Sequence, residues 1–365
     1  MPGLFRHNRT FAYQPALAWF AAFGAAWVFV LVMLGAFTTS IGAGMVFPDW
    51  PLSNGTLNPA GWLQNIAMFA EHSHRLSAGV MSTITLLLAG ALWRNEARGW
   101  LRRLGWLGVA LVLVQAVVGG LRVLLDQQQV ALIDTSVGRL FAMLHAGLAQ
   151  IFVCTLLAIA AALSRPWIEG ARALAPGGAG LHRLGVVCCG LLLAQLAIAA
   201  VMRHSFAGLA IPTFPLTPEG GLVPAHWDFR VGIHFAHRAM ALVLTVTMAW
   251  FAVAVWRSVG RQSAAGAGLK GLAALMVTLL ALQITLGAAV IWTARNAYYT
   301  TAHVLVGALT LAATFLLTWV LHRDALAGTM LNGAPSSAGP QSALPENAIS
   351  PVGTDRRAAQ FPIHA

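Results

Sequence analysis

Four histidines of the sequence, His74, His145, His237 and His303, lie in or at the ends of long apolar stretches. Ionisable side chains at membrane depth are costly and usually serve a function. Each of two groups of four apolar stretches supplies one such histidine from its second stretch and one from its fourth. Two imidazoles that face each other across a helical bundle can ligate a haem iron from both sides, and the pattern favours this chemistry.

Two other uses are open to these histidines. A single histidine in a membrane helix can hydrogen-bond to a neighbouring backbone or hydroxyl group, which is a structural role. Zinc fits less well, because a tetrahedral zinc site takes three or four protein ligands and no cysteine or carboxylate cluster accompanies the histidines. The presence of two matching pairs favours iron ligation over both uses.

An arginine follows the first histidine of each pair. Arg75 comes directly after His74, and Arg238 comes directly after His237. We expect both guanidinium groups to pair with haem propionates at the outer surface. The alternative is that they extend to the lipid headgroups.

The residue three positions before the first histidine differs between the two groups. Glu71 precedes His74, whereas His234 precedes His237. Positions i and i+3 share a helix face, so each residue is expected to point toward the haem edge of its own half. A carboxylate at one haem and an imidazole at the other predict two different tasks, with Glu71 as a proton acceptor or a stabiliser of a cationic intermediate. Pairing of Glu71 with Arg75 or water is the structural alternative.

Three further histidines are assigned weaker roles. His72 is expected to face away from His74 and to meet solvent. His204 and His226 belong to an outer connection, where they could shield a haem edge but are not expected to be ligands.

The elements that must position these residues are membrane spans. Of the 365 residues, 58% are hydrophobic and 9% are charged, whereas soluble domains carry about 25% charged residues. Stretches of about 20 apolar residues are long enough to cross a bilayer. We predict an integral membrane protein with eight spans, at residues 16–39, 73–93, 103–125, 139–163, 183–203, 233–256, 268–292 and 300–321.

Basic residues predict the orientation of these spans. They gather in the connections after the second, fourth and sixth spans, as Arg94, Arg98, Arg102, Arg103, Arg165, Arg172, Arg183, Arg257, Arg261 and Lys270, whereas residues 41–72 contain no Lys or Arg. Basic loops face the cytoplasm, so both termini are expected to be cytoplasmic. The net charge of +11 therefore reflects topology, and nucleic-acid binding is not expected because no basic cluster alternates with stacking aromatics.

The spans form an internal repeat. The connection at 44–52 resembles that at 208–216, at an offset of 164, and the motif Glu71-x-x-His74-Arg75 recurs as His234-x-x-His237-Arg238. An offset of four spans gives both halves the same orientation, which predicts a pseudo-twofold axis along the membrane normal.

The predicted fold is therefore all-α and polytopic, with eight transmembrane helices arranged as two tandem four-helix bundles with pseudo-twofold symmetry. The predicted parts are a cytoplasmic N-terminus, an N-terminal bundle, a cytoplasmic linker, a C-terminal bundle and a disordered cytoplasmic tail, at residues 1–15, 16–163, 164–182, 183–321 and 322–365. The tail is assigned as disordered because it is rich in Ala, Gly, Ser and Pro.

On these motifs the sequence resembles the haem A synthase family of membrane enzymes, over about 310 residues from the first span to the last. The resemblance implies that His74 and His145 bracket the substrate, haem O, with Glu71 as the catalytic carboxylate. It implies that His237 and His303 ligate a fixed haem b. The implied reaction is oxidation of the C8 methyl group of haem O to the formyl group of haem A, for cytochrome oxidase assembly. The implied partners are haem O synthase, cytochrome oxidase assembly factors and membrane lipid.

The sequence departs from part of that family in its cysteines. A subgroup carries a cysteine pair in the first outer loop, where Phe47 and Ser53 stand in this chain. The three cysteines present, Cys154, Cys188 and Cys189, lie within spans and are expected to be small buried residues without a disulfide. A mechanism that needs a disulfide in this loop is therefore not expected here.

Two rival functions and the location complete the sequence-based expectations. A dihaem b-type cytochrome that passes electrons from a quinol would use the same four ligands, but it has no evident need for Glu71 in one half only. A transporter is disfavoured because helices broken at the midplane are poorly developed. Residues 1–14 are too short and lightly charged for a cleaved presequence, which favours the inner membrane of a bacterial cell.

Overall fold

The computed structural model describes residues 9–130, 135–170, 179–259 and 264–331, and residues Met1–Asp324 make up one compact unit. Eight helices in the described part of the chain are long and apolar enough to span a membrane. They are α1 (Pro15–Ser40), α2 (Ile66–Asn95), α3 (Gly99–Leu124), α4 (Val137–Leu163), α6 (Ala179–His204), α7 (Phe229–Ser258), α8 (Ala264–Trp292) and α9 (Ala297–Leu331). The predicted all-helical membrane fold is thereby confirmed.

All eight spanning helices begin earlier than the apolar pattern predicts, and side-chain caps explain the early starts of α2 and α7. The side chain of Asn65 accepts hydrogen bonds from the first backbone N–H groups of α2, and Asp228 caps α7 in the same way. Side-chain caps of this kind satisfy N–H groups that have no partner inside the helix. The predicted starts at residues 73 and 233 were therefore too late, because the first turns of both helices are polar enough to escape a search for apolar stretches.

The earlier starts place the first histidine of each pair well inside its helix. His74 lies eight positions after the first residue of α2, and His237 lies eight positions after the first residue of α7. At a rise of 1.5 Å per residue, each is about 12 Å from the helix start. Both histidines are therefore about two turns within their helices, rather than at the beginning of a span as the sequence analysis assumed.

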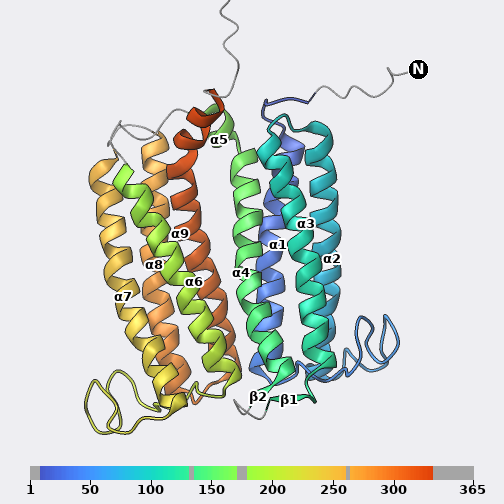
Figure 1. The fold of residues 1–365 in the computed structure, drawn as a ribbon, viewed down its shortest axis with the longest axis vertical. Coiled ribbons are helices and arrows are strands. Elements are labelled where there is room, and N and C mark those ends of the chain that lie inside the picture. The colour runs from blue at the N-terminus through green and yellow to red at the C-terminus, as the bar shows by residue number, and fades with distance from the viewer. Residues whose placement is uncertain (1–8, 131–134, 171–178, 260–263, 332–365) are drawn as a thin grey trace, which may run out of the picture. The chain divides into compact units, whose positions relative to one another are not determined.

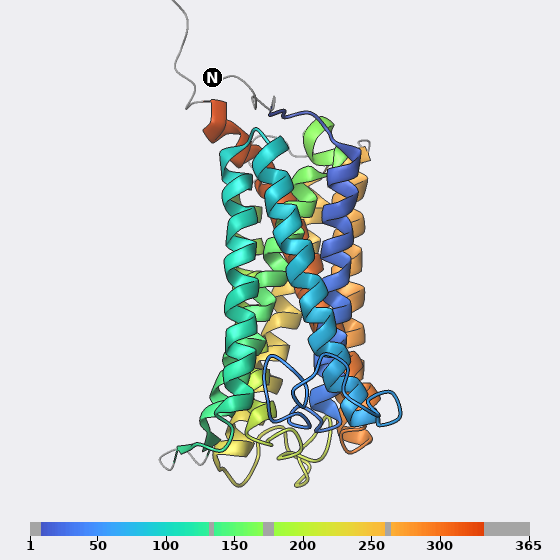
Figure 2. The ribbon, with the colours of Figure 1, turned by 90° about the vertical axis from the view of Figure 1, so that its right-hand side faces the viewer.

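The spanning helices form two groups of four within the compact unit. Helices α1 to α4 pack on one another, and buried side chains of α6, α7, α8 and α9 form a single apolar cluster. Figures 1 and 2 show these groups side by side, and α4 contacts α6 where they meet. Large apolar side chains such as Trp19, Leu86, Leu242 and Trp250 lie on the outside of the helices, as a lipid environment requires.

The connections between the spanning helices differ in length and in the secondary structure that they contain. A five-residue helix, α5 (Arg165–Glu169), follows α4, and the strands β1 (Gln129–Val130) and β2 (Thr135–Ser136) pair between α3 and α4. The longer connections, residues 41–65 and 205–228, both lie at the lower end of the helices in Figure 1. Both contain a cis peptide bond at the corresponding position, Trp50–Pro51 and Phe214–Pro215. We call these connections loop 1 and loop 2. The predicted tail falls largely on residues 332–365, which lie outside the described part of the chain.

Candidate functional site

The second histidine pair faces across the C-terminal group of helices. The ring centroids of His237 on α7 and His303 on α9 are 6.4 Å apart, with the ring planes at 62°. Two metal–nitrogen bonds of about 2 Å each, together with the half-widths of two imidazole rings, span about this distance. The pair is thus spaced so that one metal ion fits between the rings.

Small and polar residues of α8 surround His303. A Cβ atom added at Gly287 would lie 3.1 Å from Cε1 of the His303 ring, so a larger residue would require the ring to shift by a few tenths of an ångström. The side-chain nitrogen of Gln283 lies 3.3 Å from Nε2 of the same ring. Gln283 and Gly287 correspond to Gln115 and Gly119 of α3, at an offset of 168 in the sequence.

In the N-terminal group, His145 is held by α3. Its Nδ1 lies 3.2 Å from the backbone oxygen of Gln115, and the side-chain amide of Gln115 donates to the backbone oxygen of His145 at 3.1 Å. A carbonyl oxygen only accepts hydrogen bonds, so Nδ1 carries the proton and Nε2 keeps its lone pair. A hydrogen bond to one ring nitrogen is the usual way in which a protein orients a histidine for metal ligation through the other.

His74 lies against α1. A Cβ atom at Gly35 would come within 2.8 Å of Cε1 of the His74 ring, which is too close for any side chain. At the loop offset of 164, the residue that corresponds to Gly35 in the second half is Ala199. The two halves therefore differ in the space that they leave beside the first histidine.

A ring nitrogen that ligates a metal must not be engaged in a hydrogen bond, and several of the histidines meet this requirement. The Nδ1 atoms of His74, His237 and His303 are buried and have no hydrogen-bond partner among the residues that the structure describes. Buried polar groups in proteins are nearly always paired, so an unpaired one needs an explanation. An unpaired ring nitrogen can ligate a metal, so these nitrogens fit the chemistry of haem-iron ligation.

Glu71 is buried, with 4% of its surface exposed, and is fully engaged by its surroundings. One carboxylate oxygen accepts hydrogen bonds from the backbone N–H groups of Val46 and Phe47, at 2.7 and 3.2 Å. The other accepts from Arg75 at 2.6 Å. Glu71 therefore fastens loop 1 to α2, as in the structural alternative weighed for it, in addition to lying one helical turn from His74.

Arg75 is committed to loop 1. Its guanidinium group donates to the backbone oxygens of Phe47, Asp49 and Leu52 as well as to Glu71. These contacts take up most of its five N–H donors. The structure thus gives Arg75 a role in the loop, and the haem-propionate contact expected of it stays a prediction.

His234 and Arg238 repeat this arrangement with different chemistry. The backbone N–H of Ile211 donates to Nδ1 of His234 at 3.2 Å, and Nε of Arg238 lies 3.3 Å from its Nε2. Arg238 also donates to the backbone oxygens of Ile211 and Thr213, at 3.0 and 2.6 Å. His234 therefore fastens loop 2 as Glu71 fastens loop 1, but without the negative charge.

The expectation that His72 meets solvent is wrong. Only 3% of His72 is exposed, because loop 1 folds over it. Its Nδ1 lies 3.0 Å from the hydroxyl of Ser53, and its ring packs against Phe47 and Trp62 with centroids 6.0 and 4.8 Å away. The positions where related sequences carry a cysteine pair, Phe47 and Ser53, are thus both in contact with His72.

One carboxylate of loop 1, that of Asp49, accepts hydrogen bonds from the backbone of the same loop. The side chain of Asp49 accepts from the backbone N–H groups of Asn54 and Gly55, at 2.8 and 2.7 Å. Desolvation raises the pKa of Asp49, but the hydrogen bonds from Gly55 and Asn54, with the charge of Arg75, outweigh it and hold the pKa below its ordinary value of 3.8. Asp49 is therefore ionised at neutral pH and helps to hold the turn of the loop.

The sequence analysis assigned no role to Arg122, Arg139 and Arg203, which lie near the same ends of the helices. Arg122 donates to the backbone oxygen of Gly44 at 2.7 Å, and Arg203 donates to the hydroxyl of Ser40 at 3.0 Å. The signal that could have revealed them is their position, since arginines at the outer ends of spans run against the orientation rule.

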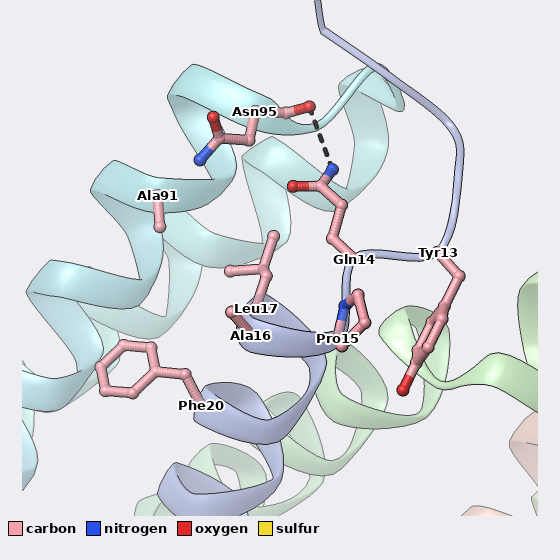
Figure 3. A pocket seen from close by; sticks show the side chains of 8 residues that line it. All are labelled: Tyr13, Gln14, Pro15, Ala16, Leu17, Phe20, Ala91 and Asn95. Atoms are coloured by element: carbon pink, nitrogen blue, oxygen red, sulfur yellow. Dashed lines mark hydrogen bonds between the residues drawn. The ribbon is translucent and has the colours of Figure 1, made fainter.

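A surface pocket lies at the opposite ends of the helices. Figure 3 shows its lining side chains from α1 and α2, among them Leu17, Phe20 and Asn95. Asn95 is 21 positions after His74, or about 30 Å along α2. This pocket is therefore remote from all four histidines and takes no part in the site.

Comparison with known proteins gives the same assignment as the motifs. A family model described as a cytochrome oxidase assembly protein, COX15-CtaA, matches residues 18–315. A "Heme A synthase" of Geobacillus kaustophilus is 29% identical over 297 residues, which cover 80% of this chain and 86% of that protein. Proteins of the same name from Geobacillus thermodenitrificans and Rhodopseudomonas palustris are each 26% identical, over 80% of this chain and 86% of their own lengths. The matched region contains all four histidines, Glu71, loop 1 and loop 2, and the chain belongs to the COX15-CtaA family of membrane proteins.

Proposed function

We propose that this protein is a haem A synthase, which oxidises the C8 methyl group of haem O to the formyl group of haem A. The observation that carries the proposal is the placement of the His237 and His303 ring centroids 6.4 Å apart, together with a carboxylate, Glu71, in the motif of the other half only. Family membership and the name of the related proteins support it. The alternative, a dihaem cytochrome that relays electrons from a quinol, gives no reason for that difference.

In this proposal the two histidine pairs hold different porphyrins. His237 and His303 hold a resident haem b, for which their 6.4 Å separation is suited. His74 and His145 hold the substrate, haem O. A resident haem supplies one-electron redox chemistry, while the protein fixes the orientation of the substrate and restricts the access of water.

Glu71 is the proposed catalytic carboxylate. It lies three positions before His74, on the same face of α2, so it borders the substrate half of the protein. Oxidation of a methyl group releases protons, which a carboxylate can accept. Its ion pair with Arg75 and its hydrogen bonds to loop 1 hold the side chain in place.

The membrane arrangement follows the charge pattern of the sequence. We propose that both termini are cytoplasmic, that loops 1 and 2 face the opposite side, and that residues 16–163 and 183–321 are tandem bundles related by a pseudo-twofold axis. The host membrane is proposed to be the bacterial inner membrane. A haem O synthase must supply the substrate, and cytochrome oxidase assembly factors would receive the product.

The test is expression of the full chain in cells that make haem O but no haem A. We expect haem A to appear in the extracted pigments, identified by chromatography and mass spectrometry. Purified protein that contains haem b but never forms haem A would overturn the proposal and favour the electron relay. Colourless protein would exclude both functions.

A further inference from the structure

Three arginines and one histidine gather where the outer ends of the two helix groups meet. Arg122 is near the end of α3, Arg139 is in the first turn of α4, and Arg203 and His204 end α6. His204 is close enough to Arg122, Arg203, Arg139 and His145 to interact electrostatically with each of them. We call the three arginines the outer cation cluster.

The guanidinium groups of the outer cation cluster are only partly used by the protein. Arg122 donates to the backbone oxygen of Gly44, and Arg203 donates to α1 through Ala36 and Ser40. Arg139 lies over the ring of Phe206, 5.0 Å from its centroid. Each guanidinium has five N–H donors, so several donors in this cluster are available to a ligand.

Carboxylates do not neutralise the cluster. Among the described residues, the ion pairs formed by arginines with carboxylates involve Arg75, Arg98 and Arg165, and none of the three cluster arginines. Asp126 and Glu71 act on Arg122 from a distance, but Glu71 is already paired with Arg75. The three arginines are half-buried, and half-buried like charges without counterions are unfavourable unless an anion joins them.

The position of the cluster relates it to the first histidine pair. Arg139 precedes His145 by six positions on α4, which is about 9 Å toward the outer end of the helix. On α3, Gly119 contacts the His145 ring and Arg122 is one turn further out. A flat ligand held at His145 with its polar edge outward would therefore present that edge to the cluster.

We propose that the outer cation cluster binds the carboxylate groups at the edge of the porphyrin substrate, and so sets the orientation of the ring between His74 and His145. This inference rests on the proposed function and assigns the propionate contacts of the substrate to residues other than Arg75. Arginine suits this task because its planar fork binds carboxylates in a bidentate manner. A porphyrin with two carboxylates also supplies the negative charge that the cluster lacks.

The test measures binding rather than turnover. Full-length protein, loaded with haem b and placed in bilayer discs of zwitterionic lipid, is titrated with haem O and with haem O dimethyl ester, in which both carboxylates are esterified. Absorbance gives both dissociation constants. We expect the wild-type protein to prefer the diacid by about tenfold or more, as the loss of charge-assisted hydrogen bonds implies.

Variants assign the preference to the cluster. Arg122→Gln, Arg203→Gln and Arg139→Gln should each reduce the preference several-fold, and the corresponding lysine variants should restore part of it. Arg139→Gln is the safest variant for folding, because in the described part of the chain the Arg139 side chain contacts the ring of Phe206 without a hydrogen bond, and the hydrogen bond to Ser136 comes from the backbone. The matched control is Arg230→Gln, an exposed arginine at the start of α7, which should keep the preference. Retained haem b absorbance in the C-terminal half verifies the fold of each variant.

The outcomes separate this inference from the proposed function. Wild-type protein that forms haem A but binds the diacid and the diester equally would overturn the inference and leave the function standing. Equal binding together with a melting temperature that rises with phosphatidylglycerol, and does so only when Arg122 is present, would identify the cluster as a lipid-headgroup site. Wild-type protein that binds neither compound and forms no haem A would overturn both.

Discussion

The two halves of the protein have the same order of helices and histidines, but they differ in residue type at two corresponding positions. Glu71 and His234 both fasten an outer loop through backbone N–H groups, yet one is a carboxylate and the other an imidazole. Gly35 touches the ring of His74, whereas an alanine, Ala199, occupies the corresponding position in the second half. The loop anchors thus need only an acceptor, and the N-terminal half differs by the negative charge of Glu71 and by a glycine beside its first histidine.

The largest effects should come from removing the histidines, because each pair is proposed to hold a different porphyrin. His237→Ala or His303→Ala should remove the haem b that purifies with the protein. His74→Ala or His145→Ala should leave this haem b in place and abolish haem A formation. Pigment analysis of the four purified variants checks this prediction. Loss of the resident haem from all four variants would show that the two histidine pairs do not hold different porphyrins.

The anchor residues should differ strongly in their effect on turnover. Glu71→Gln keeps an oxygen that can accept from loop 1 but removes the charge, and it should lower the rate of haem A formation about 10²-fold to 10⁴-fold. His234→Gln exchanges one neutral acceptor for another and should lower the rate by no more than about fivefold, the effect of one weakened hydrogen bond. Rates are compared at equal haem b content. Similar losses in both variants would mean that Glu71 acts only as a loop anchor.

The glycine beside His74 should control how firmly the N-terminal half holds its porphyrin. Gly35→Ala places a methyl group where the ring lies, 2.8 Å from Cε1, and so drives the ring away from α1 toward the bundle interior. Overpacking of 1–3 kcal/mol corresponds to a roughly 5-fold to 150-fold change in the dissociation constant for haem O. We expect tighter binding and slower release.

The control for this variant is Gly79→Ala on α2, where an added Cβ would meet nothing within 4 Å. It should raise helix stability by up to about 1 kcal/mol and leave haem O binding unchanged. Weaker haem O binding in Gly35→Ala would show that His74 must stay against α1 to serve as a ligand.

The smallest effect concerns the acid sensitivity of the two loops. The pKa of Asp49 is below its ordinary value in the folded protein, so its contribution to loop 1 is complete above the ordinary pKa and is lost as the pH falls through the lowered one. Hydrogen exchange of residues 49–56 should therefore become faster below about pH 4. Asp49→Asn should exchange fast at every pH after correction for the intrinsic rate.

Glu219 in loop 2 provides the matched control for Asp49. The hydroxyl of Thr217 lowers the pKa of Glu219, but this carboxylate is on the surface, where hydrogen bonds and charges are screened by water. Glu219→Gln should change the exchange of loop 2 less than Asp49→Asn changes that of loop 1. An equal change would show that the two backbone hydrogen bonds from Asn54 and Gly55 to Asp49 do not stabilise loop 1 more than the contact with Thr217 stabilises loop 2.

Much of the fold follows directly from composition and periodicity. Eight apolar stretches of sufficient length predict eight helices, and the order of histidines in the repeat predicts that each half contributes them from its second and fourth spans. The helix starts were less accurate, because Asn65 and Asp228 extend α2 and α7 through polar turns by capping them. This extension also explains why His72, predicted to be exposed, lies in the helix and beneath loop 1.

The sequence by itself determined the helical membrane fold, the repeat and the identity of the four histidines, since these depend on local hydropathy and on residue type. The tertiary structure decided which groups those residues contact. The packing of distant segments decides whether Glu71 and Arg75 face a ligand or a loop, and how far apart His237 and His303 lie. It also brings arginines from α3, α4 and α6 close together. Such contacts join residues as far apart as Ser40 and Arg203, which are separated by 163 positions, and no local pattern in the chain encodes them.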